Sequence, residues 1–418
     1  MRVVIAGQGY VGLPLAIRAA EVGHQVVGFD VDPVRIGRLA AGESYVEDVQ
    51  ADRIRAVLDA GSYRPTTNPD ECASFEVALI TVPTPLRDGV PDLSYVEAAA
   101  ELLGRHLGPG GTVVLESTTY PGTTAEVVGP VLEKASGLTA GSDFFLGFSP
   151  ERIDPGNPTW NVVNTPKIVS GVDEASLSKV KAFYDTVVDT TVTVSSCREA
   201  ELAKLIENTF RHVNIALVNE IAMISNDLGI DVWQAIDAAS TKPFGFMRFI
   251  PGPGVGGHCL PIDPSYLSWR VQRALGQSFR FVDLANDINN HMPDYVVRRL
   301  IDALNRRQRS VSGSRILLLG LAYKKNTGDA RESPAVRIVQ LLRQMGAEVR
   351  VADPHVVEAV HGAPDLTLVE VTAEELSAAD AVVVLADHDQ FDYDLIERKA
   401  RYVLDTRHRV RGATVEVI

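Results

Sequence analysis

Short apolar runs and segments of helical composition alternate through the first half of the chain. The runs at residues 2–6, 25–30, 77–82, 112–115 and 144–148 have the length and the Val, Ile, Leu and Phe content of buried strands. Strands that are separated by helical segments predict a parallel, doubly wound sheet. We therefore expect an α/β domain over about residues 1–190.

The pattern changes over residues 199–228, which contain no Gly or Pro. Apolar residues recur there at helical spacing, at Leu202, Leu205, Ile206, Val213, Leu217, Ile221 and Ile224. A helix of about 30 residues extends about 45 Å, and such a length usually supports a second domain or an oligomer interface. The segment that follows at 251–264, PGPGVGGHCLPIDP, is too rich in Gly and Pro for a helix or a central strand, so we expect a loop.

A second α/β pattern occupies the last hundred residues. Strand-like runs at 315–320, 348–354, 381–386 and 402–406 accompany a helical segment near 335–345. The six arginines of residues 298–315 precede it, and in so acidic a chain they indicate a solvated helix end and a domain boundary rather than a nucleic-acid arm. We predict two Rossmann-like α/β domains, 1–195 and 312–418, joined by a long central helix within a helical domain, 196–300.

Composition narrows the class of protein. The 418 residues carry 40 Lys and Arg against 54 Asp and Glu, a net charge of −14, so binding to a nucleic-acid polymer or an anionic membrane is not expected. Hydrophobic residues make up 45% and charged residues 22%, as in average soluble proteins. Without a signal peptide or an apolar run of about 18 residues, we expect a cytoplasmic protein. The cysteines Cys72, Cys197 and Cys259 are too far apart in sequence for a disulfide framework or a zinc cluster, and no metal site is expected.

The first predicted turn, GQGYVG, has the spacing G-x-G-x-x-G at Gly7, Gly9 and Gly12. It follows a strand, opens a helix and precedes Asp30 at the end of the next strand, which together make the dinucleotide fingerprint. Gly7 permits the tight turn, Gly9 lets the backbone approach a pyrophosphate, and Gly12 allows close packing of helix and strand. The alternative is an ordinary glycine turn in a domain without a cofactor.

Asp30 favours NAD over NADP. Its carboxylate would accept hydrogen bonds from the adenosine ribose and repel an additional phosphate. Arg35 complicates this preference, because an arginine here could neutralise that phosphate or could lie beside the adenine.

The corresponding turn of the second α/β domain, GLAYKKNTGDARESP, is longer and lacks the glycine triplet. It places Lys324, Lys325 and Arg331 near the C-terminal edge of a strand, where open α/β sheets bind ligands. A solvated basic loop and a site for a second, phosphate-bearing ligand are both compatible with this composition.

Cys259 lies in the Gly-rich loop, just before Asp263 and Pro264. Asp is a good N-cap and Pro a good first helical residue, so a helix should begin there. A thiol beside a helix N-terminus has a lowered pKa and is more reactive. The alternative for Cys259 is a buried, unreactive cysteine. The alternative for Asp263 is a purely structural helix cap. His258 is expected to pack or to form a hydrogen bond rather than to bind a ligand.

Lys204 and Asn208 are four residues apart on the long helix and share a face, which His212 extends. A solvated stripe is the simpler reading. If this face lines a cleft, however, a desolvated lysine could act as a base or stabilise an oxyanion. Glu151 and Thr118 follow predicted strands of the first domain and so lie near the cofactor edge of its sheet.

Taken together, GQGYVG, ESTTYPG, FSPERIDPGN, ELAKLIEN, GPGVGGHCLPIDP and GLAYKKNTGDARESP resemble the UDP-glucose/GDP-mannose dehydrogenase family. These motifs stand in the family order and cover almost the whole chain. The resemblance implies an enzyme that oxidises the C6 alcohol of a nucleotide sugar to a carboxylate with NAD. It also implies a homodimer formed through the central helix and a C-terminal domain that binds the sugar nucleotide.

The resemblance also assigns site residues. It implies Cys259 as the nucleophile, Lys204 and Asn208 as the pair that holds the reacting oxygen, and Asp263, Glu151 and Thr118 as the groups around the hydrolytic water. The implied cofactor residues are Gly7, Gly9, Tyr10, Val11, Gly12, Asp30, Arg35, Thr84, Thr118 and Arg331. The implied substrate residues are Glu151, Arg152, Lys204, Asn208, Lys242, Arg248, Gly256, Tyr323, Lys324 and either Arg407 or His408. Of these, Lys242 and Arg248 are expected to reach the site of a neighbouring subunit.

The chemistry implied is a four-electron oxidation. Lys204, directly or through water, removes the proton of the C6 hydroxyl while a hydride passes from C6 to NAD, and Cys259 then adds to the aldehyde. The thiohemiacetal loses a second hydride to become a thioester, which water hydrolyses. The sequences GGHCLPID, PERIDPGN and TKPFGFM look like the UDP-N-acetylglucosamine 6-dehydrogenase branch, with UDP-N-acetylmannosamine and UDP-glucose as alternative substrates. A two-electron hydroxyacid-type dehydrogenase and a non-catalytic NAD-binding module are the competing functions.

Overall fold

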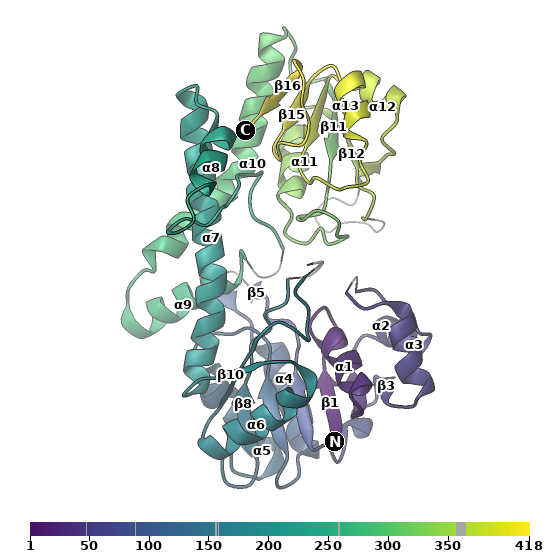
Figure 1. Ribbon diagram of the computed structural model, residues 1–418, viewed down its shortest axis with the longest axis vertical. Helices are drawn as coiled ribbons and strands as arrows, with labels where there is room; N and C mark the ends of the chain where they lie inside the picture. Colours follow the sequence, from purple (N-terminus) through teal and green to yellow (C-terminus); the bar gives the residue numbers. More distant parts are fainter. Residues whose placement is uncertain (47, 88, 155–156, 158, 258–259, 357–364) are drawn as a thin grey trace. The chain divides into compact units, whose positions relative to one another are not determined.

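The computed structural model describes residues 1–418 except 47, 88, 155–156, 158, 258–259 and 357–364. The chain divides into two compact units, which are described separately. The first unit comprises Met1–Glu207 and Ser265–Gln277, and the second comprises Asn208–Pro264 and Ser278–Ile418. Figure 1 shows the elements of both, coloured along the sequence.

The first unit contains an eight-stranded sheet in the order β10-β9-β8-β7-β4-β1-β2-β3. Neighbouring strands are parallel except β8 and β9, which are antiparallel. The strands are β1 Arg2–Ala6, β2 Gln25–Phe29, β3 Tyr63–Thr66, β4 Val77–Ile80, β7 Thr112–Leu115, β8 Phe145–Phe148, β9 Lys167–Gly171 and β10 Thr191–Thr193. The doubly wound α/β class is therefore confirmed, with one antiparallel pair that the periodicity did not predict.

Helices cover both faces of this sheet. Side chains alternate along β1, so Val3 and Ile5 enter one apolar core and Val4 and Ala6 enter the other. The first core contains residues of α1 Gly12–Glu21, α2 Pro33–Ala40, α3 Ala51–Asp59 and α6 Glu174–Val187, and the second those of α4 Ser94–His106 and α5 Gly129–Ser136. Short elements complete the unit: η1 Pro69–Cys72, the hairpin of β5 Leu86–Arg87 and β6 Val90–Pro91, and the π-helical turn η2 Thr124–Val128.

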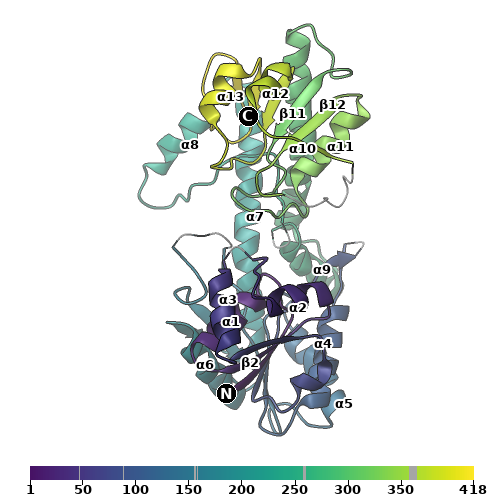
Figure 2. The same cartoon turned by 90° about the vertical axis from the view of Figure 1, so that its right-hand side faces the viewer.

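The second unit contains a six-stranded, wholly parallel sheet in the order β13-β12-β11-β14-β15-β16. Its strands are β11 Arg315–Leu319, β12 Glu348–Ala352, β13 Thr367–Leu368, β14 Ala381–Val384, β15 Val403–Asp405 and β16 Val415–Val417. Two helices, α10 Arg280–Arg306 and α11 Pro334–Gln344, lie on one face (Figures 1 and 2), and α12 Ala373–Ala378 and α13 Tyr393–Lys399 lie on the other. This second α/β fold confirms the predicted repetition.

Two helices contribute residues to both units. The predicted long helix is α7, Cys197–Asp227, with 31 residues, and α9 comprises Asp263–Leu275. A shorter helix, α8 Val232–Ser240, follows α7. Each helix of the described residues is too short or too polar to cross a bilayer.

Both units hold the loop after their first central strand in the same way. The Gly7 N–H donates to the Phe29 carbonyl at the end of β2, and the Gly320 N–H donates to the Ala352 carbonyl at the end of β12, both over 2.8 Å. The next residue after β2 or β12 is an aspartate that accepts loop N–H groups. Asp30 accepts a hydrogen bond from the Gln8 N–H over 2.8 Å, and Asp353, which follows β12, accepts one from the Leu321 N–H over 2.7 Å.

A buried ion pair lies beneath the C-terminal edge of the first sheet. Glu116, the residue after β7, accepts a hydrogen bond from the Lys167 ammonium group over 2.9 Å and another from the Tyr184 hydroxyl. Lys167 also donates to the Pro150 carbonyl over 3.1 Å. Burial raises the pKa of Glu116, and the charge of Lys167 opposes this shift.

Lys167→Met should lower the free energy of unfolding by about 3–5 kcal/mol, because it leaves Glu116 buried without its counter-charge. The double variant Glu116→Gln, Lys167→Met removes both charges and should recover most of this loss. Urea unfolding followed by circular dichroism measures both. Equal destabilisation in the single and double variants would contradict the coupling of these two residues.

Candidate functional site

The Gly-rich turn of the first unit has the geometry of a pyrophosphate cradle. Gly7 has φ +98°, and a Cβ there would lie 2.7 Å from the Thr81 carbonyl oxygen. A Cβ on Gly12, the first residue of α1, would lie 1.9 Å from the Gly7 carbonyl oxygen, so neither glycine tolerates a side chain. A Cβ on Gly9 would meet nothing within 4 Å, which leaves open space beside the backbone at the helix N-terminus. The residues present therefore fit a dinucleotide.

Asp30 is buried at the end of β2, where it holds the turn together. Its Oδ2 accepts hydrogen bonds from the Gln8 N–H and from the Arg35 guanidinium, each over 2.8 Å, and its Oδ1 accepts from the Asp32 N–H over 3.0 Å. Arg35, which was ambiguous in sequence, thus forms an ion pair with Asp30.

Gln8 is a site residue that the sequence pattern did not reveal. Its side-chain Oε1 accepts from the Tyr63 hydroxyl over 2.8 Å, and its carbonyl accepts from the Tyr45 hydroxyl. The Tyr45 ring lies beside Arg35, whose guanidinium carbon is 5.7 Å from the ring centroid. The position is a variable "x" of the G-x-G motif, so no local signal pointed to it.

The remaining cofactor candidates divide between the two units. Tyr10 and Val11 stand in the turn before α1, and Tyr10 is exposed. The Thr84 carbonyl accepts a hydrogen bond from the Tyr266 hydroxyl over 2.6 Å. Arg331 belongs to the second unit, where its guanidinium pairs with Asp329 over 2.7 Å.

Three of the other first-unit candidates, Thr118, Glu151 and Arg152, follow the ends of strands, and the fourth, Lys204, lies on a helix. Glu151 follows β8 and accepts a hydrogen bond from the Ile153 N–H. Thr118 is half-buried, whereas its neighbour Thr119 is completely buried with an unpaired hydroxyl. Lys204, on α7, is buried. Arg152 donates to the Pro166 carbonyl and pairs with Glu207, each over 2.6 Å, so its charge already has a partner within the chain.

In the second unit, residues on both sides of Cys259 in the Gly-rich loop form hydrogen bonds with other segments. Cys259 and His258 themselves lie outside the described residues. On the C-terminal side of Cys259, Asn208 donates from Nδ2 to Asp263 Oδ2 over 2.6 Å, and both side chains are buried. Helix α9 begins at Asp263, so the predicted helix N-terminus is confirmed within one residue. The structure thus brings together two of the predicted site residues that are 55 positions apart.

On its N-terminal side, the same loop packs against the loop after β11. The Gly257 N–H donates to the Arg331 carbonyl over 3.1 Å. A Cβ on Gly256 would lie 2.7 Å from Tyr323 Cβ, so glycine is needed for this close approach. Gly256 and Tyr323, both predicted substrate residues, therefore lie in contact.

Arg407 and His408 differ in their surroundings. The Arg407 Nε donates to the Leu385 carbonyl over 2.8 Å, and its guanidinium lies against Gly252 at the start of the Gly-rich loop. Burial lowers the pKa of Arg407. His408 instead lies against the Trp233 ring, 4.8 Å between centroids, at φ +56°. Arg407 rather than His408 therefore lies beside the Gly-rich loop.

Within the described residues, the contacts of Lys242 and Arg248 are with other parts of the second unit. Lys242 lies over the Phe244 ring, 5.0 Å from its centroid, and Arg248 forms an exposed ion pair with Asp237 over 2.8 Å. Within the described residues, no group of three or more His, Cys, Asp or Glu side chains could hold a metal ion.

A glycine turn that fits a pyrophosphate, with a buried carboxylate after the second strand, is typical of an NAD-binding domain. Three family models match the chain in order: the NAD binding domain at residues 1–188, the central domain at 198–291 and the UDP binding domain at 317–412. The chain belongs to the UDP-glucose/GDP-mannose dehydrogenase family. It is therefore an NAD-dependent oxidoreductase, as the motifs predicted.

Similar proteins match nearly the whole chain. A UDP-N-acetyl-D-glucosamine 6-dehydrogenase of Pseudomonas aeruginosa is 38% identical over 94% of this chain and 91% of its own length. A UDP-N-acetyl-D-mannosamine dehydrogenase of Pyrococcus horikoshii is 36% identical over 100% of this chain and 98% of its own. The solved structure of a UDP-D-ManNAc dehydrogenase from Pyrococcus horikoshii superposes with a TM-score of 0.90 at 33% identity, covering 100% of this chain and 99% of that one.

Asp30→Ala should reduce the preference for NAD over NADP by about 10- to 100-fold, because it removes a buried charged acceptor for the ribose and releases Arg35 toward a phosphate. The ratio of kcat/KM for the two cofactors measures it. Asp32→Ala is the matched control, since Asp32 caps α2 by accepting from the Val34 N–H. An unchanged ratio in Asp30→Ala would remove this residue from cofactor selection.

Proposed function

We propose that this enzyme oxidises the C6 alcohol of a UDP-sugar to the carboxylate in two NAD-dependent steps. The observation that carries the proposal is the buried Asn208–Asp263 hydrogen bond, because it joins the predicted oxyanion residue to the helix start that follows Cys259. The match of residues 317–412 to a UDP binding domain supports the nucleotide. The contact between Tyr323 and Gly256 supports a site at this loop.

When bound, NAD supplies the hydride acceptor for both oxidations. Lys204, which is buried on α7, removes the proton of the C6 hydroxyl, directly or through water. The Cys259 thiolate then adds to the aldehyde carbon. Lys204 and Asn208 stabilise the oxyanion of the resulting thiohemiacetal, whose oxidation leaves a thioester.

Water releases the product acid from the thioester. Asp263 is the acceptor best placed near Cys259 in sequence, and its hydrogen bond to Asn208 fixes its orientation. Glu151 and Thr118 assist this water in the proposal. The free thiol of Cys259 is regenerated when the thioester carbon–sulfur bond breaks.

UDP-N-acetylglucosamine is the proposed sugar nucleotide. The sequence GGHCLPID, with Ile262, and the stretch TKPFGFM at 241–247 support this branch. Relatives named for N-acetylglucosamine and for N-acetylmannosamine are similarly close, at 38% and 36% identity. UDP-N-acetylmannosamine is therefore the first alternative, and UDP-glucose the second.

We propose that the cytoplasmic enzyme works as a homodimer with domains at 1–195, 196–300 and 312–418. One side of α7 supports the dimer, because Leu217, Ile221 and Ile224 recur there at helical spacing and are all exposed. Lys242 and Arg248, in the exposed segment after α8, would reach the partner's substrate.

Incubation with NAD and a panel of UDP-sugars should yield two NADH per sugar oxidised, with the highest kcat/KM for UDP-N-acetylglucosamine. Absorbance at the NADH band and chromatography of the uronate measure the ratio. A ratio of one would indicate the two-electron hydroxyacid-type reaction, and no NADH with any sugar would indicate a non-catalytic NAD-binding module.

Cys259→Ser should abolish net uronate formation, because a serine hydroxyl cannot form the thioester intermediate, while the first oxidation to the aldehyde or a trapped adduct persists. Cys197→Ala, at a buried cysteine of the first unit, is the matched control and should retain the wild-type stoichiometry. Undiminished uronate formation by Cys259→Ser would remove this thiol from the mechanism.

A further inference from the structure

The loop between β11 and α11, residues 320–333, carries the predicted substrate residues Tyr323 and Lys324. Two of its non-glycine residues have a left-handed backbone, Asn326 at φ +57° and Glu332 at φ +50°. Such conformations persist only where surrounding contacts hold them. What holds this loop is therefore relevant to nucleotide binding.

Asp353, directly after β12, holds the start of the loop. Its Oδ2 accepts hydrogen bonds from the Leu321 and Ala322 N–H groups over 2.7 and 2.9 Å. Its Oδ1 accepts from the N–H groups of His355 and Val356 over 2.8 and 3.1 Å. Burial alone would raise the pKa of Asp353, but these hydrogen bonds and the one from His388 lower it to about 2.

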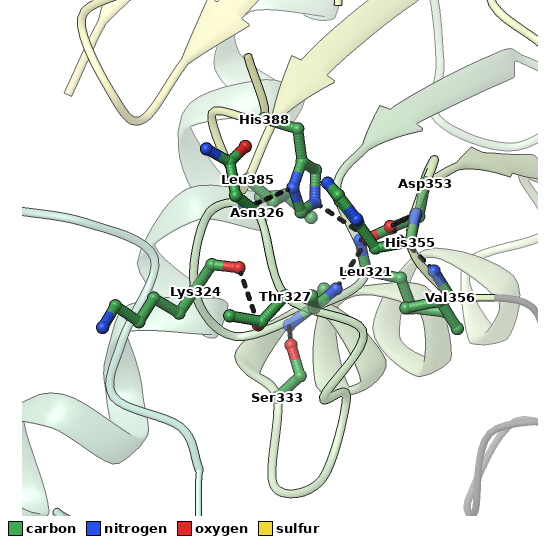
Figure 3. Close-up of polar contacts among 12 residues, drawn as sticks. Leu321, Lys324, Asn326, Thr327, Ser333, Asp353, His355, Val356, Leu385 and His388 are labelled. Atoms are coloured by element: carbon green, nitrogen blue, oxygen red, sulfur yellow. Dashed lines mark hydrogen bonds and ion pairs between the residues drawn. The ribbon is translucent and has the colours of Figure 1, made fainter. Parts of the chain in front are cut away.

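His388, in the segment after β14, bridges Asp353 and the middle of the loop (Figure 3). Its Nδ1 lies 2.9 Å from the backbone nitrogen of Asn326, and its Nε2 lies 3.0 Å from Asp353 Oδ2. The Asn326 N–H is a donor and the Asp353 carboxylate is an acceptor. Nδ1 therefore accepts and Nε2 donates, which assigns one tautomer to the His388 ring. Both side chains are completely buried.

Asn326 is also held through its own side chain. Its Nδ2 donates to Asp389 Oδ2 over 2.6 Å, and its Oδ1 accepts from the Asp389 N–H over 3.0 Å. Residues 321–322 and 326 are thus both anchored, and Tyr323 and Lys324 lie between the two anchors. In Figure 3 the Lys324 side chain points away from His388 and Asp353, and its carbonyl accepts from the Thr327 hydroxyl over 3.2 Å.

We propose that His388 and Asp353 are positioning residues for the UDP-sugar, which hold Tyr323 and Lys324 in place through the backbone of Leu321, Ala322 and Asn326. This proposal rests on the function proposed above. The imidazole contributes by accepting the Asn326 N–H at Nδ1, while Asp353 fixes the tautomer that makes Nδ1 an acceptor.

Two amide substitutions of His388 each remove one of these two contacts. His388→Asn keeps an acceptor near the Nδ1 position, and His388→Gln keeps a donor near the Nε2 position but loses the acceptor for Asn326. His388→Gln should raise the KM for the UDP-sugar and the Kd for UDP about tenfold, whereas His388→Asn should stay within about threefold of wild type. The KM for NAD and the kcat at saturating sugar should not change in either variant.

Steady-state kinetics and calorimetric titration with UDP, on the full-length protein, measure these values. His355→Gln is the matched control, because this imidazole lies 4.9 Å from His388 but bonds to Gln390 instead of the loop. If His388→Gln fails to fold, Asn326→Asp places two carboxylates together at Asp389 and should also raise the Kd for UDP without changing the KM for NAD.

The outcomes distinguish this proposal from the function. Three results would overturn the positioning role while wild-type turnover still supports the function. The first is a KM for the UDP-sugar and a Kd for UDP that are equal in His388→Gln and wild type. The second is an equal loss of affinity in His388→Gln and His388→Asn, and the third is a parallel rise in the KM for NAD. A wild type that binds UDP but oxidises no UDP-sugar would overturn the function alone, and the titrations would still decide the positioning role. A wild type that binds no UDP would overturn both.

Discussion

An aspartate at the end of the second strand organises the functional edge of each α/β unit. Where the chain leaves a parallel sheet, the N–H groups of the turn lose their partners in the sheet, and a buried donor without an acceptor is costly. Asp30 accepts the Gln8 N–H in the first unit, and Asp353 accepts those of Leu321 and Ala322 in the second. The shapes of both ligand loops depend on these carboxylates.

The two aspartates differ in the side chain that forms an ion pair or hydrogen bond with each of them. Asp30 is completed by Arg35, a side chain that is 37% exposed. Asp353 is completed by His388, and the two side chains are fully enclosed. The second carboxylate is therefore closed to a ligand, which is consistent with a loop that has lost the glycine triplet and presents Tyr323 and Lys324 instead.

The strands that periodicity predicted are the central ones, because burial on both faces imposes a continuous apolar run. Within the two large sheets, the strands it missed lie toward the edges: β3, β9 and β10 in the first sheet, and β13 and β16 in the second. β3 has the sequence YRPT, β10 has only three residues, and β9 begins with Lys167, which is buried through its contact with Glu116. The antiparallel direction of β9 has no signature in its own residues, because it follows from pairing with β8.

The sequence by itself determined the α/β class, the long helix, the dinucleotide turn and the family. Each of these follows from local constraints, such as a positive φ at Gly7 or the period of a helix, which are written in neighbouring residues. Only the tertiary structure decided that Asn208 bonds to Asp263, that Arg407 rather than His408 turns toward the Gly-rich loop, and that His388 joins Asp353 to Asn326. These partners are 35 or more residues apart in sequence, and packing alone brings them together.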